Sequence, residues 1–431
     1  MNYLKMSSIL SNRQFGFLPG RLTILQLLKV VDEWTNILEK GGVIDVIYCD
    51  FKKAFDTVPH KRLIDVLRHY GIKDQVLAWV SDFLSERKFQ VIVNGSKSEI
   101  FDVLSGVPQG SVLGPLLFII YINLMIEIAG NAEMYLYADD LKLFKRIASE
   151  VEVEELQHSL DKLYDWTQYS LLKFHPNKCA TMRIMSKSNK ISNKTYYNLD
   201  ETKLKNVIQE QDLGIIFDCN LSFDEHIYKK VKKANALAGM IRRTFVFLDK
   251  ETFKLLFTSI VRPHLEYGAP VWNPHQKNLI CMIENVQRRA SKLIPGMSNH
   301  TYEERLKCLK LPTLQYRRYR GDMIEMYKIS HGLYDQRAIG NFIEFQSNSQ
   351  NLRRHAFTIY KENCKKDVRK FAFKCRVTNA WNNLPTKIVN APTLNCFKNR
   401  LDRLWKENDV MYNPELDLHE ITSARNTRYK K

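Results

Sequence analysis

Three aspartates in the first half of the sequence stand where carboxylates could bind metal ions. Asp50 follows the apolar run VIDVIYC, and Asp139 and Asp140 lie inside a second apolar stretch, YLYADDLKLF. Carboxylates beside apolar strand ends are unfavourable unless they are paired or bind cations, and converging ones repel one another. Two divalent cations, for which oxygen ligands favour Mg²⁺, would relieve that repulsion and catalyse phosphoryl transfer. The simpler alternative is that Asp139 and Asp140 are only turn residues, because aspartate suits turns.

A loop rich in glycine and proline lies between these aspartates. The segment SGVPQGSVLGP, residues 105–115, contains three glycines and two prolines and comes directly before a long apolar run. Such a loop lets the backbone approach a nucleotide closely and places the start of a helix near phosphate. Taken alone, the segment could equally be an ordinary turn.

The elements that must position these residues follow from hydrophobic spacing and turn signals. A buried strand is expected at 43–49, and Asn94-Gly95 indicates a hairpin between 89–93 and 100–104. A second hairpin is expected around residues 138–140, and a further strand at 180–185. The spacing predicts helices over 24–38, 59–70, 74–86, 110–129, 149–173, 226–248, 251–261, 279–293 and 394–405, and a helical block over 302–329.

The most apolar stretch, residues 112–129, calls for a membrane test. It has close to the length of a transmembrane helix, which needs about 20 predominantly apolar residues. Pro115, Asn123 and Glu127 interrupt it. We therefore expect a buried helix and no membrane partner.

The charge of the chain is distributed unevenly. The formal net charge is +18, but residues 1–200 carry 24 Lys and Arg against 23 Asp and Glu. Residues 201–431 carry 41 basic and 24 acidic residues, a net of +17. A polyanionic partner is expected for this second half, in which basic and aromatic residues alternate, as in Tyr316 to Arg320. Each short basic run could also be a solvated helix face.

The eight cysteines are scattered through the sequence. They form no C-x-x-C pair and no Cys/His group with zinc-finger spacing. We expect free and mostly buried thiols in a reducing compartment.

Eight ordered motifs in this sequence resemble the reverse transcriptases of non-long-terminal-repeat (non-LTR, LINE-type) retrotransposons, close to the jockey-like lineages. They cover most of the chain, which makes a chance match very improbable. The motifs are QFGFLPGR (14–21), DFKKAFDTVPH (50–60), SGVPQGSVLGPLLF (105–118), YADD (137–140), LKFHPNKC (172–179), DLGIIFD (212–218), VRPHLEYGAPVWNP (261–274) and ENVQRRASKLI (284–294).

The resemblance implies a role for each matching residue. Asp50, Asp139 and Asp140 match the catalytic aspartates that bind two Mg²⁺ ions, for which Mn²⁺ is a possible substitute. The remaining matches belong to the nucleotide-binding site. Phe51 would offer its backbone carbonyl to a metal ion, and Phe55 would be a steric gate against the ribose 2′-hydroxyl. Gln109 and Gly110 would lie along the nucleotide, Lys178 near the triphosphate, and Arg21 on template or nucleotide. For Phe55, Lys178 and Arg21 the alternatives are a core aromatic or an ordinary charged residue.

The resemblance also implies an α+β fold with the right-hand architecture of polymerases. A palm with partial fingers would span residues 1–190, a mainly helical thumb-like region 191–300, and a basic C-terminal accessory region 301–431. Its partners would be an RNA template, a DNA primer and deoxynucleoside triphosphates. The basic block 353–376 could serve as a nuclear import signal, so we expect a ribonucleoprotein in nucleus and cytoplasm.

Compared with complete retrotransposon polyproteins, this sequence lacks several recognisable domains. It begins a few residues before the first motif, and no endonuclease, ribonuclease H or zinc knuckle is recognisable, so we expect a truncated copy of a larger polyprotein. Two functions follow as hypotheses. The chain is an RNA-directed DNA polymerase that copies element RNA from a DNA 3′-end, or it is a catalytically inactive nucleic-acid-binding remnant.

Overall fold

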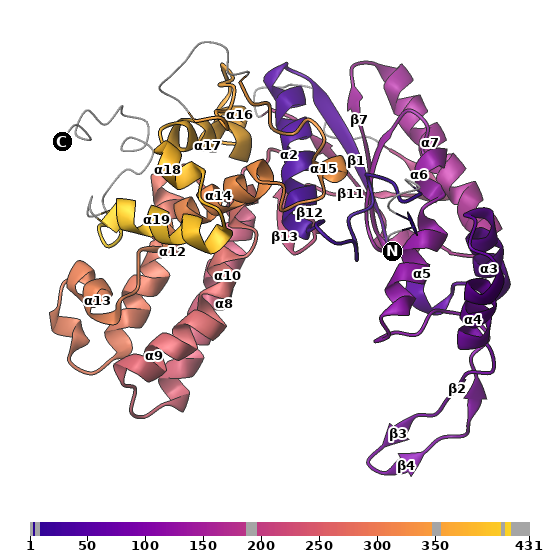
Figure 1. The fold of residues 1–431 in the computed structure, drawn as a ribbon, viewed down its shortest axis with the longest axis horizontal. Helices are drawn as coiled ribbons and strands as arrows, with labels where there is room; N and C mark the ends of the chain where they lie inside the picture. The colour runs from indigo at the N-terminus through magenta and orange to yellow at the C-terminus, as the bar shows by residue number, and fades with distance from the viewer. Residues whose placement is uncertain (1–2, 5–8, 187–195, 347–354, 407–409, 415–431) are drawn as a thin grey trace. The chain divides into compact units, whose positions relative to one another are not determined.

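The computed structural model describes residues 3–4, 9–186, 196–346, 355–406 and 410–414 (Figure 1). The chain forms two compact units: unit 1 comprises Met1–Gln26 and Gly41–Leu213, and unit 2 comprises Leu27–Lys40 and Gly214–Lys431. The boundary that we expected after residue 190 lies outside the described residues. The predicted division into three regions therefore stays a prediction.

Unit 1 is built on a five-stranded sheet in the order β11-β8-β1-β7-β6. The strands are β1 (Val43–Cys49), β6 (Glu133–Tyr137), β7 (Asp140–Ile147), β8 (Ala180–Ile184) and β11 (Lys205–Asn206). β1 runs antiparallel to both β7 and β8. Six of its seven residues are buried, which agrees with a continuous β-branched run in the middle of a covered sheet.

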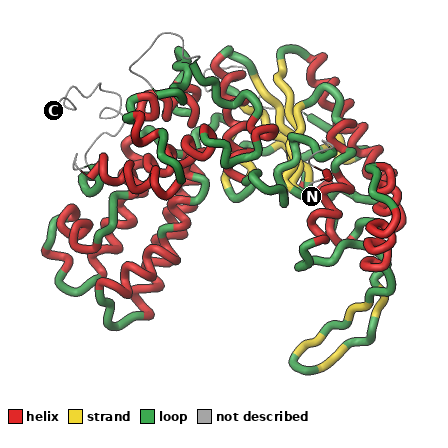
Figure 2. Tube along the Cα trace, viewed as in Figure 1, coloured by secondary structure: helices red, strands yellow, loops and turns green. Residues whose placement is uncertain are grey.

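The helices of unit 1 lie beside this sheet, and Figure 2 shows them in red next to the yellow strands. They are α3 (His60–His69), α4 (Asp74–Leu84), α5 (Leu113–Ile122), α6 (Met125–Ile128) and α7 (Glu150–Ser170). α7 begins with a capping box, in which the side chains of Ser149 and Glu152 reciprocally satisfy backbone amides of the first turn. The smaller strands of the unit are β2 (Lys88–Phe89), β3 (Ile92–Val93), β4 (Ser96–Lys97), β5 (Phe101–Asp102), β9 (Asn198–Leu199), β10 (Thr202–Lys203) and β12 (Gln209–Asp212).

The apolar stretch 112–129 forms two helices, α5 and α6, where we expected one. The interruption follows Asn123, whose buried amide accepts a hydrogen bond from the Ser11 N–H (2.9 Å) and donates one to the Ile9 carbonyl (2.8 Å). These bonds tie the break to the N-terminal segment. Among the residues that the structure describes, no helix combines the length and the apolar character needed to cross a membrane.

Unit 2 is mainly helical. Its elements are most of α2 (Thr23–Glu39), β13 (Ile215–Asp218), α8 (Asp224–Thr244), α9 (Lys250–Leu256) with a π-helical continuation (Phe257–Val261), α10 (Pro263–Glu266), α11 (Ala269–Trp272), α12 (Lys277–Ala290), α13 (Tyr302–Leu309), α14 (Leu314–Ser330), α15 (Gln336–Ile339), α16 (Asp367–Lys370), α17 (Phe373–Asn382), α18 (Thr386–Val389) and α19 (Leu394–Lys406). The buried ring of Trp34 packs against Phe217, with ring centroids 5.6 Å apart, which anchors α2 in this unit. Together the two units give the mixed helix and strand content of the predicted α+β class.

Many basic residues of unit 2 are buried in ion pairs. Arg376 bonds to Asp322, with both side chains at most 2% exposed. In the run that we considered a nucleic-acid contact, Tyr316, Arg318 and Tyr319 are buried. Arg320 pairs with Asp402 at 2.5 Å. The interpretation of this run as a nucleic-acid surface is therefore wrong, because its side chains hold α14 in the core.

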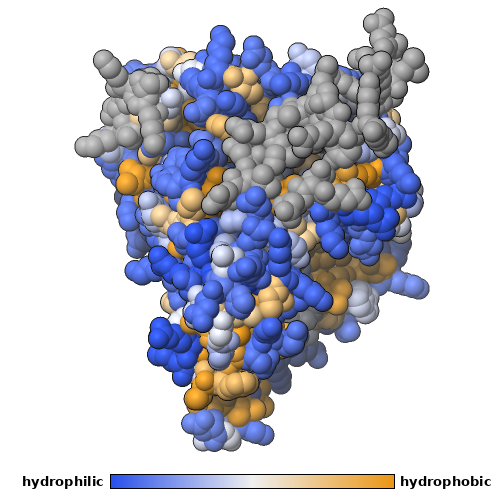
Figure 3. All heavy atoms as spheres, turned by 90° about the vertical axis from the view of Figure 1, so that its left-hand side faces the viewer, coloured by the Kyte–Doolittle hydropathy of each residue, from blue (hydrophilic) through white to orange (hydrophobic). Residues whose placement is uncertain are grey.

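Other basic residues remain accessible. The face of the molecule in Figure 3 is covered largely by hydrophilic side chains. Along α8, five cationic residues are exposed: Lys229, Lys232, Lys233, Arg242 and Arg243. These five residues form the exposed basic surface of α8. The net charge of residues 201–431 does not by itself show which cations are exposed.

A buried histidine in unit 2 predicts a specific pH dependence of stability. The Ile216 N–H donates to His226 Nδ1 (3.1 Å), and burial together with the charge of Lys230 lowers the pKa of His226 to about 3. Below pH 6.5 the unfolded chain binds a proton that the folded histidine refuses, so stability falls as the pH falls. Between pH 7 and pH 5 this group should account for a loss of about 2 kcal/mol in the free energy of unfolding.

Urea unfolding of wild type and His226→Asn at both pH values measures this loss. Asparagine can keep an acceptor for the Ile216 amide but does not titrate, so the variant should lose about 2 kcal/mol less than wild type between the two pH values. Parallel pH profiles for the two proteins would show that His226 is not the group responsible.

Candidate active site

The three predicted metal-binding aspartates meet at one end of the unit 1 sheet. Cys49 of β1 stands opposite Leu141 of β7, and Asp50 and Asp140 are the next residues toward the strand ends. Tyr137 of β6 stands opposite Asp140, so residues 138 and 139 form the tight turn of this hairpin. The turn places Asp139 beside the pair, with Ala138 in the left-handed region at φ 54°.

A pocket opens at these strand ends. Asp50, Asp140, Lys178, Glu210 and Asp212 form the charged part of its lining. Lys178 is the pocket's exposed cation, and its Nζ lies 2.9 Å from Asp50 Oδ2. Four carboxylates around one accessible ammonium leave an excess of negative charge at this place.

The electrostatics of the aspartates show that they repel one another. Partial removal from water raises the pKa of Asp140 to about 6, and the charges of Asp139, Asp212 and Asp50 add to the effect. The pKa of Asp139 is raised by the same loss of hydration and by Asp50. The neighbouring Asp50 carboxylate in turn raises the pKa of Lys178. Converging oxygen donors with this charge excess fit a divalent metal such as Mg²⁺, which binds hard oxygen ligands.

The first motif of the sequence supports the turn that carries Asp139. The buried amide oxygen of Gln14 accepts hydrogen bonds from the N–H groups of Gly16 (2.7 Å) and Ala138 (3.1 Å). The Phe15 N–H also donates to the Leu136 carbonyl at 2.8 Å. A Cβ on Gly16 would lie 2.3 Å from the Ala138 nitrogen, so this contact requires glycine. Sequence reasoning missed the role of Gln14, although the residue lies in a quoted motif.

The chain after Asp50 is held by the segment that carries Lys178. The His175 N–H donates to the Asp50 carbonyl at 2.7 Å, and the ring of Phe51 stacks on Phe174 with centroids 4.7 Å apart. The short 3₁₀ turn Pro176–Lys178 follows directly and directs Lys178 to Asp50. Residues 50–51 and 174–178 thus form one packed junction, although more than 120 positions separate them.

Three other residues that we predicted to bind the nucleotide are Phe55, Gln109 and Gly110. Phe55 stacks on Phe118, with centroids 4.3 Å apart, and meets Phe17 edge-on at 6.0 Å. Gln109 is exposed, and its Nε2 donates to Asp56 Oδ1 at 2.8 Å. Gly110 has a left-handed φ of 82° and an open surrounding, as expected for a loop that a ligand can approach. The structure therefore brings three quoted motifs together at Phe55.

Arg21 lies apart from the pocket lining. Its side chain is 3% exposed, and Nη1 donates to the carbonyls of Ser11 and Gln14, both at 2.6 Å. In this arrangement the guanidinium fixes the N-terminal segment, and through Gln14 it supports the turn at Ala138.

Two charged residues of the site were missed from the sequence. Lys142 of β7 and Asp212 of β12 form an ion pair with side chains that are 1% and 4% exposed. Asp212 lines the pocket together with Asp140, and Lys142 is its buried partner. The motif DLGIIFD contains Asp212, but nothing in the sequence shows that Lys142, 70 positions away, is its partner.

Comparison with known proteins decides the family. Residues 1–234 match the family model described as reverse transcriptase (RNA-dependent DNA polymerase), a range that contains every predicted site residue. The chain belongs to the reverse transcriptase family. Its members generally use divalent metal ions, in agreement with the donor set of this reverse transcriptase.

Curated relatives agree with this assignment. The reverse transcriptase is 27% identical over 317 residues to the RNA-directed DNA polymerase from mobile element jockey of Drosophila funebris, a match that covers 70% of this chain and 34% of the relative. It is 26% identical to the probable RNA-directed DNA polymerase from transposon BS of Drosophila melanogaster, covering 66% and 33%. The resemblance to jockey-like non-LTR reverse transcriptases is confirmed. The chain spans about a third of the length of these relatives.

Solved structures show a more distant likeness. Apo telomerase from Candida tropicalis matches with a TM-score of 0.40 and 10% identity, covering 74% of this chain and 54% of that one. Telomerase from Candida albicans in complex with a telomeric RNA fragment gives a TM-score of 0.40 and 10% identity, covering 72% and 57%.

Proposed function

We propose that this protein is an RNA-directed DNA polymerase of a non-LTR retrotransposon. The observation that supports this function most directly is the convergence of Asp50, Asp139 and Asp140 in a reverse transcriptase domain. The substrates would be deoxynucleoside triphosphates, and the reaction would join the primer 3′-oxygen to the α-phosphorus with release of pyrophosphate. The template would be the element's RNA, and the primer a DNA 3′-end.

In this mechanism the residues of the pocket hold the reacting groups. Asp50, Asp139 and Asp140 would bind two Mg²⁺ ions, or Mn²⁺ in their place, together with the carbonyl of Phe51. When bound, such ions activate the attacking 3′-hydroxyl and neutralise the charge that develops on the phosphates. Lys178, which reaches across the pocket to Asp50, would exchange that partner for the triphosphate. Gln109 and Gly110 would lie along the nucleotide, and Arg21 would act by supporting the fingers segment.

We further propose a right-hand arrangement for the fold. The sheet that carries the aspartates corresponds to a palm with partial fingers over residues 1–190. Residues 191–300 correspond to a thumb-like region, and residues 301–431 to a basic accessory region. The exposed cations of α8 would contact nucleic-acid phosphates without reading sequence. A ribonucleoprotein in nucleus and cytoplasm is the setting that this function would require.

Primer extension tests the proposed activity. The purified chain should incorporate dTTP on poly-rA/oligo-dT in the presence of Mg²⁺, and EDTA should abolish incorporation. A full-length jockey-like relative serves as the positive control under the same conditions. If the chain binds RNA but incorporates nothing while the control works, the alternative function as a non-catalytic nucleic-acid-binding remnant is favoured.

Replacing Phe55 with alanine should weaken the selection against ribonucleotides. The Phe55 ring is held between Phe118 and Phe17, so a bulky group stands at a fixed place in the palm. Exclusion of one extra small group by shape is worth roughly 10- to 200-fold. The ratio of kcat/KM for dTTP and UTP, measured in one variant, should fall by about that factor.

The ratio is independent of how much of the variant is folded, because both nucleotides are tested on the same preparation. Phe89→Ala, on the exposed β2 strand, is the matched control and should keep the wild-type ratio. Unchanged sugar selectivity in Phe55→Ala would remove the gate role.

A further inference from the structure

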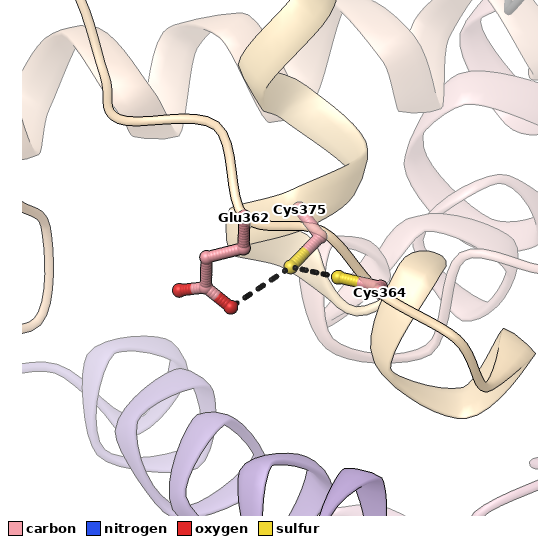
Figure 4. Close-up of side chains that lie close together, drawn as sticks. All are labelled: Glu362, Cys364 and Cys375. Carbon is pink, nitrogen blue, oxygen red and sulfur yellow. Dashed lines mark hydrogen bonds between the residues drawn. The ribbon is translucent and has the colours of Figure 1, made fainter.

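A second group of metal-ligating side chains lies in unit 2. Glu362, Cys364 and Cys375 point toward one another (Figure 4). Their ligand atoms all lie within 4.8 Å of one another, and all three residues are half-buried. The two Sγ atoms are 3.3 Å apart, and the Cys375 Sγ lies 3.6 Å from Glu362 Oε2. All eight cysteines are free thiols, as expected, but the expectation that most of them are buried is wrong, since only Cys49 and Cys179 are buried.

Local structure fixes both sides of this group. Cys375 lies in the first turn of α17, whereas Glu362 and Cys364 lie in the irregular segment before α16. That segment is tied to α2, because the N–H groups of residues 365 and 366 donate to the two carboxylate oxygens of Glu39 at 2.6 and 3.0 Å. The three ligand side chains are therefore presented by backbone that is held in place independently of any metal.

The distances resemble those of a tetrahedral zinc centre. Zn–S bonds of about 2.3 Å and Zn–O bonds of about 2.0–2.2 Å place two sulfurs about 3.8 Å apart and a sulfur and an oxygen about 3.5 Å apart. The observed separations of 3.3 and 3.6 Å differ from these by no more than about half an ångström. A disulfide would need the sulfurs at about 2.05 Å, more than 1 Å closer than they are.

The charges around the group can accept a divalent cation. Arg369 lies 2.6 Å from Glu362 and 2.6 Å from Asp32, and Lys374 lies 2.7 Å from the other oxygen of Glu362. The negative charges of Asp32 and Glu362 are therefore already balanced by the positive charges of Arg369 and Lys374. If two thiols lose their protons when a Zn²⁺ ion binds, the local charge stays at zero, so no buried charge is left uncompensated.

We propose that Glu362, Cys364 and Cys375 form a zinc site with its fourth position open. Two thiolates select a soft divalent ion such as Zn²⁺ over Mg²⁺ or Ca²⁺, which prefer oxygen ligands. The site is thus chemically distinct from the aspartate pocket and is independent of the polymerase proposal. The ion would join the segment before α16 to α17. The spacing of the cysteines, eleven positions, matches no zinc-finger pattern, so only the folded chain reveals the group.

Metal content of the full chain tests the site. Protein purified under reducing conditions with Zn²⁺ present should retain one zinc per chain after desalting. Substitution with Co²⁺ should give a sulfur-to-cobalt charge-transfer absorption. Cys364→Ser and Cys375→Ser should each weaken zinc binding at least tenfold in a chelator competition. The matched control is Cys396→Ser, a half-buried cysteine outside the group, which should bind zinc like wild type.

Glu362→Gln keeps the shape of the side chain and gives a test that does not depend on the cysteines. It should weaken zinc binding by a smaller factor, compared at a temperature where circular dichroism shows that the variant is folded. The proposal is overturned if the folded wild-type chain shows no charge-transfer band, or if all variants bind zinc alike. A Cys364–Cys375 disulfide, with no metal uptake after its reduction, would overturn it too.

Discussion

Replacing Asp139 with asparagine should abolish nucleotide incorporation and leave folding and RNA binding nearly unchanged. Loss of one ligand carboxylate removes several kcal/mol of transition-state stabilisation. Since each 1.36 kcal/mol is about tenfold in rate, incorporation should fall by roughly a thousandfold or more. Asparagine occupies the same volume, and the cations exposed on α8 are untouched. Primer extension and a filter-binding assay with RNA measure the two properties separately.

The same variant should be at least as thermally stable as wild type. In the absence of metal, lost hydration and the charge of Asp50 raise the pKa of Asp139, which means that the folded chain disfavours this carboxylate. Removing the charge relieves the repulsion. Asp161→Asn, at an exposed position of α7, is the matched control and should retain full activity. Activity that persists in Asp139→Asn would show that the site is assigned incorrectly.

Replacing Asp322 with alanine should have the largest effect on stability. The Asp322 carboxylate accepts bonds from Arg376 Nε and Nη2, both at 3.0 Å, and from Asn273 Nδ2 at 3.1 Å. Asp322 is 1% exposed, and the adjacent Arg318 is buried too. Truncation leaves buried guanidinium charge without its carboxylate, which typically destabilises a protein by about 3–5 kcal/mol.

Thermal unfolding followed by circular dichroism measures this loss. A destabilisation of that size should lower the unfolding midpoint by roughly 10 °C. Asp65→Ala is the control, because Asp65 pairs with Arg68 at 2.7 Å but both side chains are more than half exposed. That exposed pair should be worth at most about 1 kcal/mol. Equal effects of the two substitutions would mean that the Arg376 pair does not stabilise the core of unit 2.

The sequence predicted the elements of unit 1 well, because their signals are local. The buried strand at 43–49 and the hairpin turn at Asn94-Gly95 are confirmed, with Val93 opposite Ser96 in the register. Continuous β-branched runs and primed turns each have one favourable backbone conformation, so a few residues determine them. The break of the apolar helix at Asn123 could not be predicted this way, since the backbone groups that bond to the Asn123 side chain belong to the distant residues Ser11 and Ile9.

The basic half shows the limit of reasoning from charge. A net charge of +17 indicates a polyanionic partner, but it does not say which cations are free to meet one. Arg318, Arg369 and Arg376 are buried, and their carboxylate neighbours come from distant positions such as Asp32. The cations of α8 remain exposed because they lie on the helix surface away from its buried residues. Folding thus divides one basic region into structural pairs and accessible charge.

The sequence by itself determined the family and the order of the motifs, and it singled out three aspartates as candidate metal ligands. These depend on residue types at fixed spacings, which survive without coordinates. Only the tertiary structure decided which side chains meet: Gln14 beneath the Ala138 turn, Lys142 with Asp212, and Glu362 with its two cysteines. The physical reason is that ion pairs and metal ligands act over a few ångströms, whereas Gln14 and Ala138 are 124 positions apart, Lys142 and Asp212 are 70 apart, and the two cysteines are 11 apart.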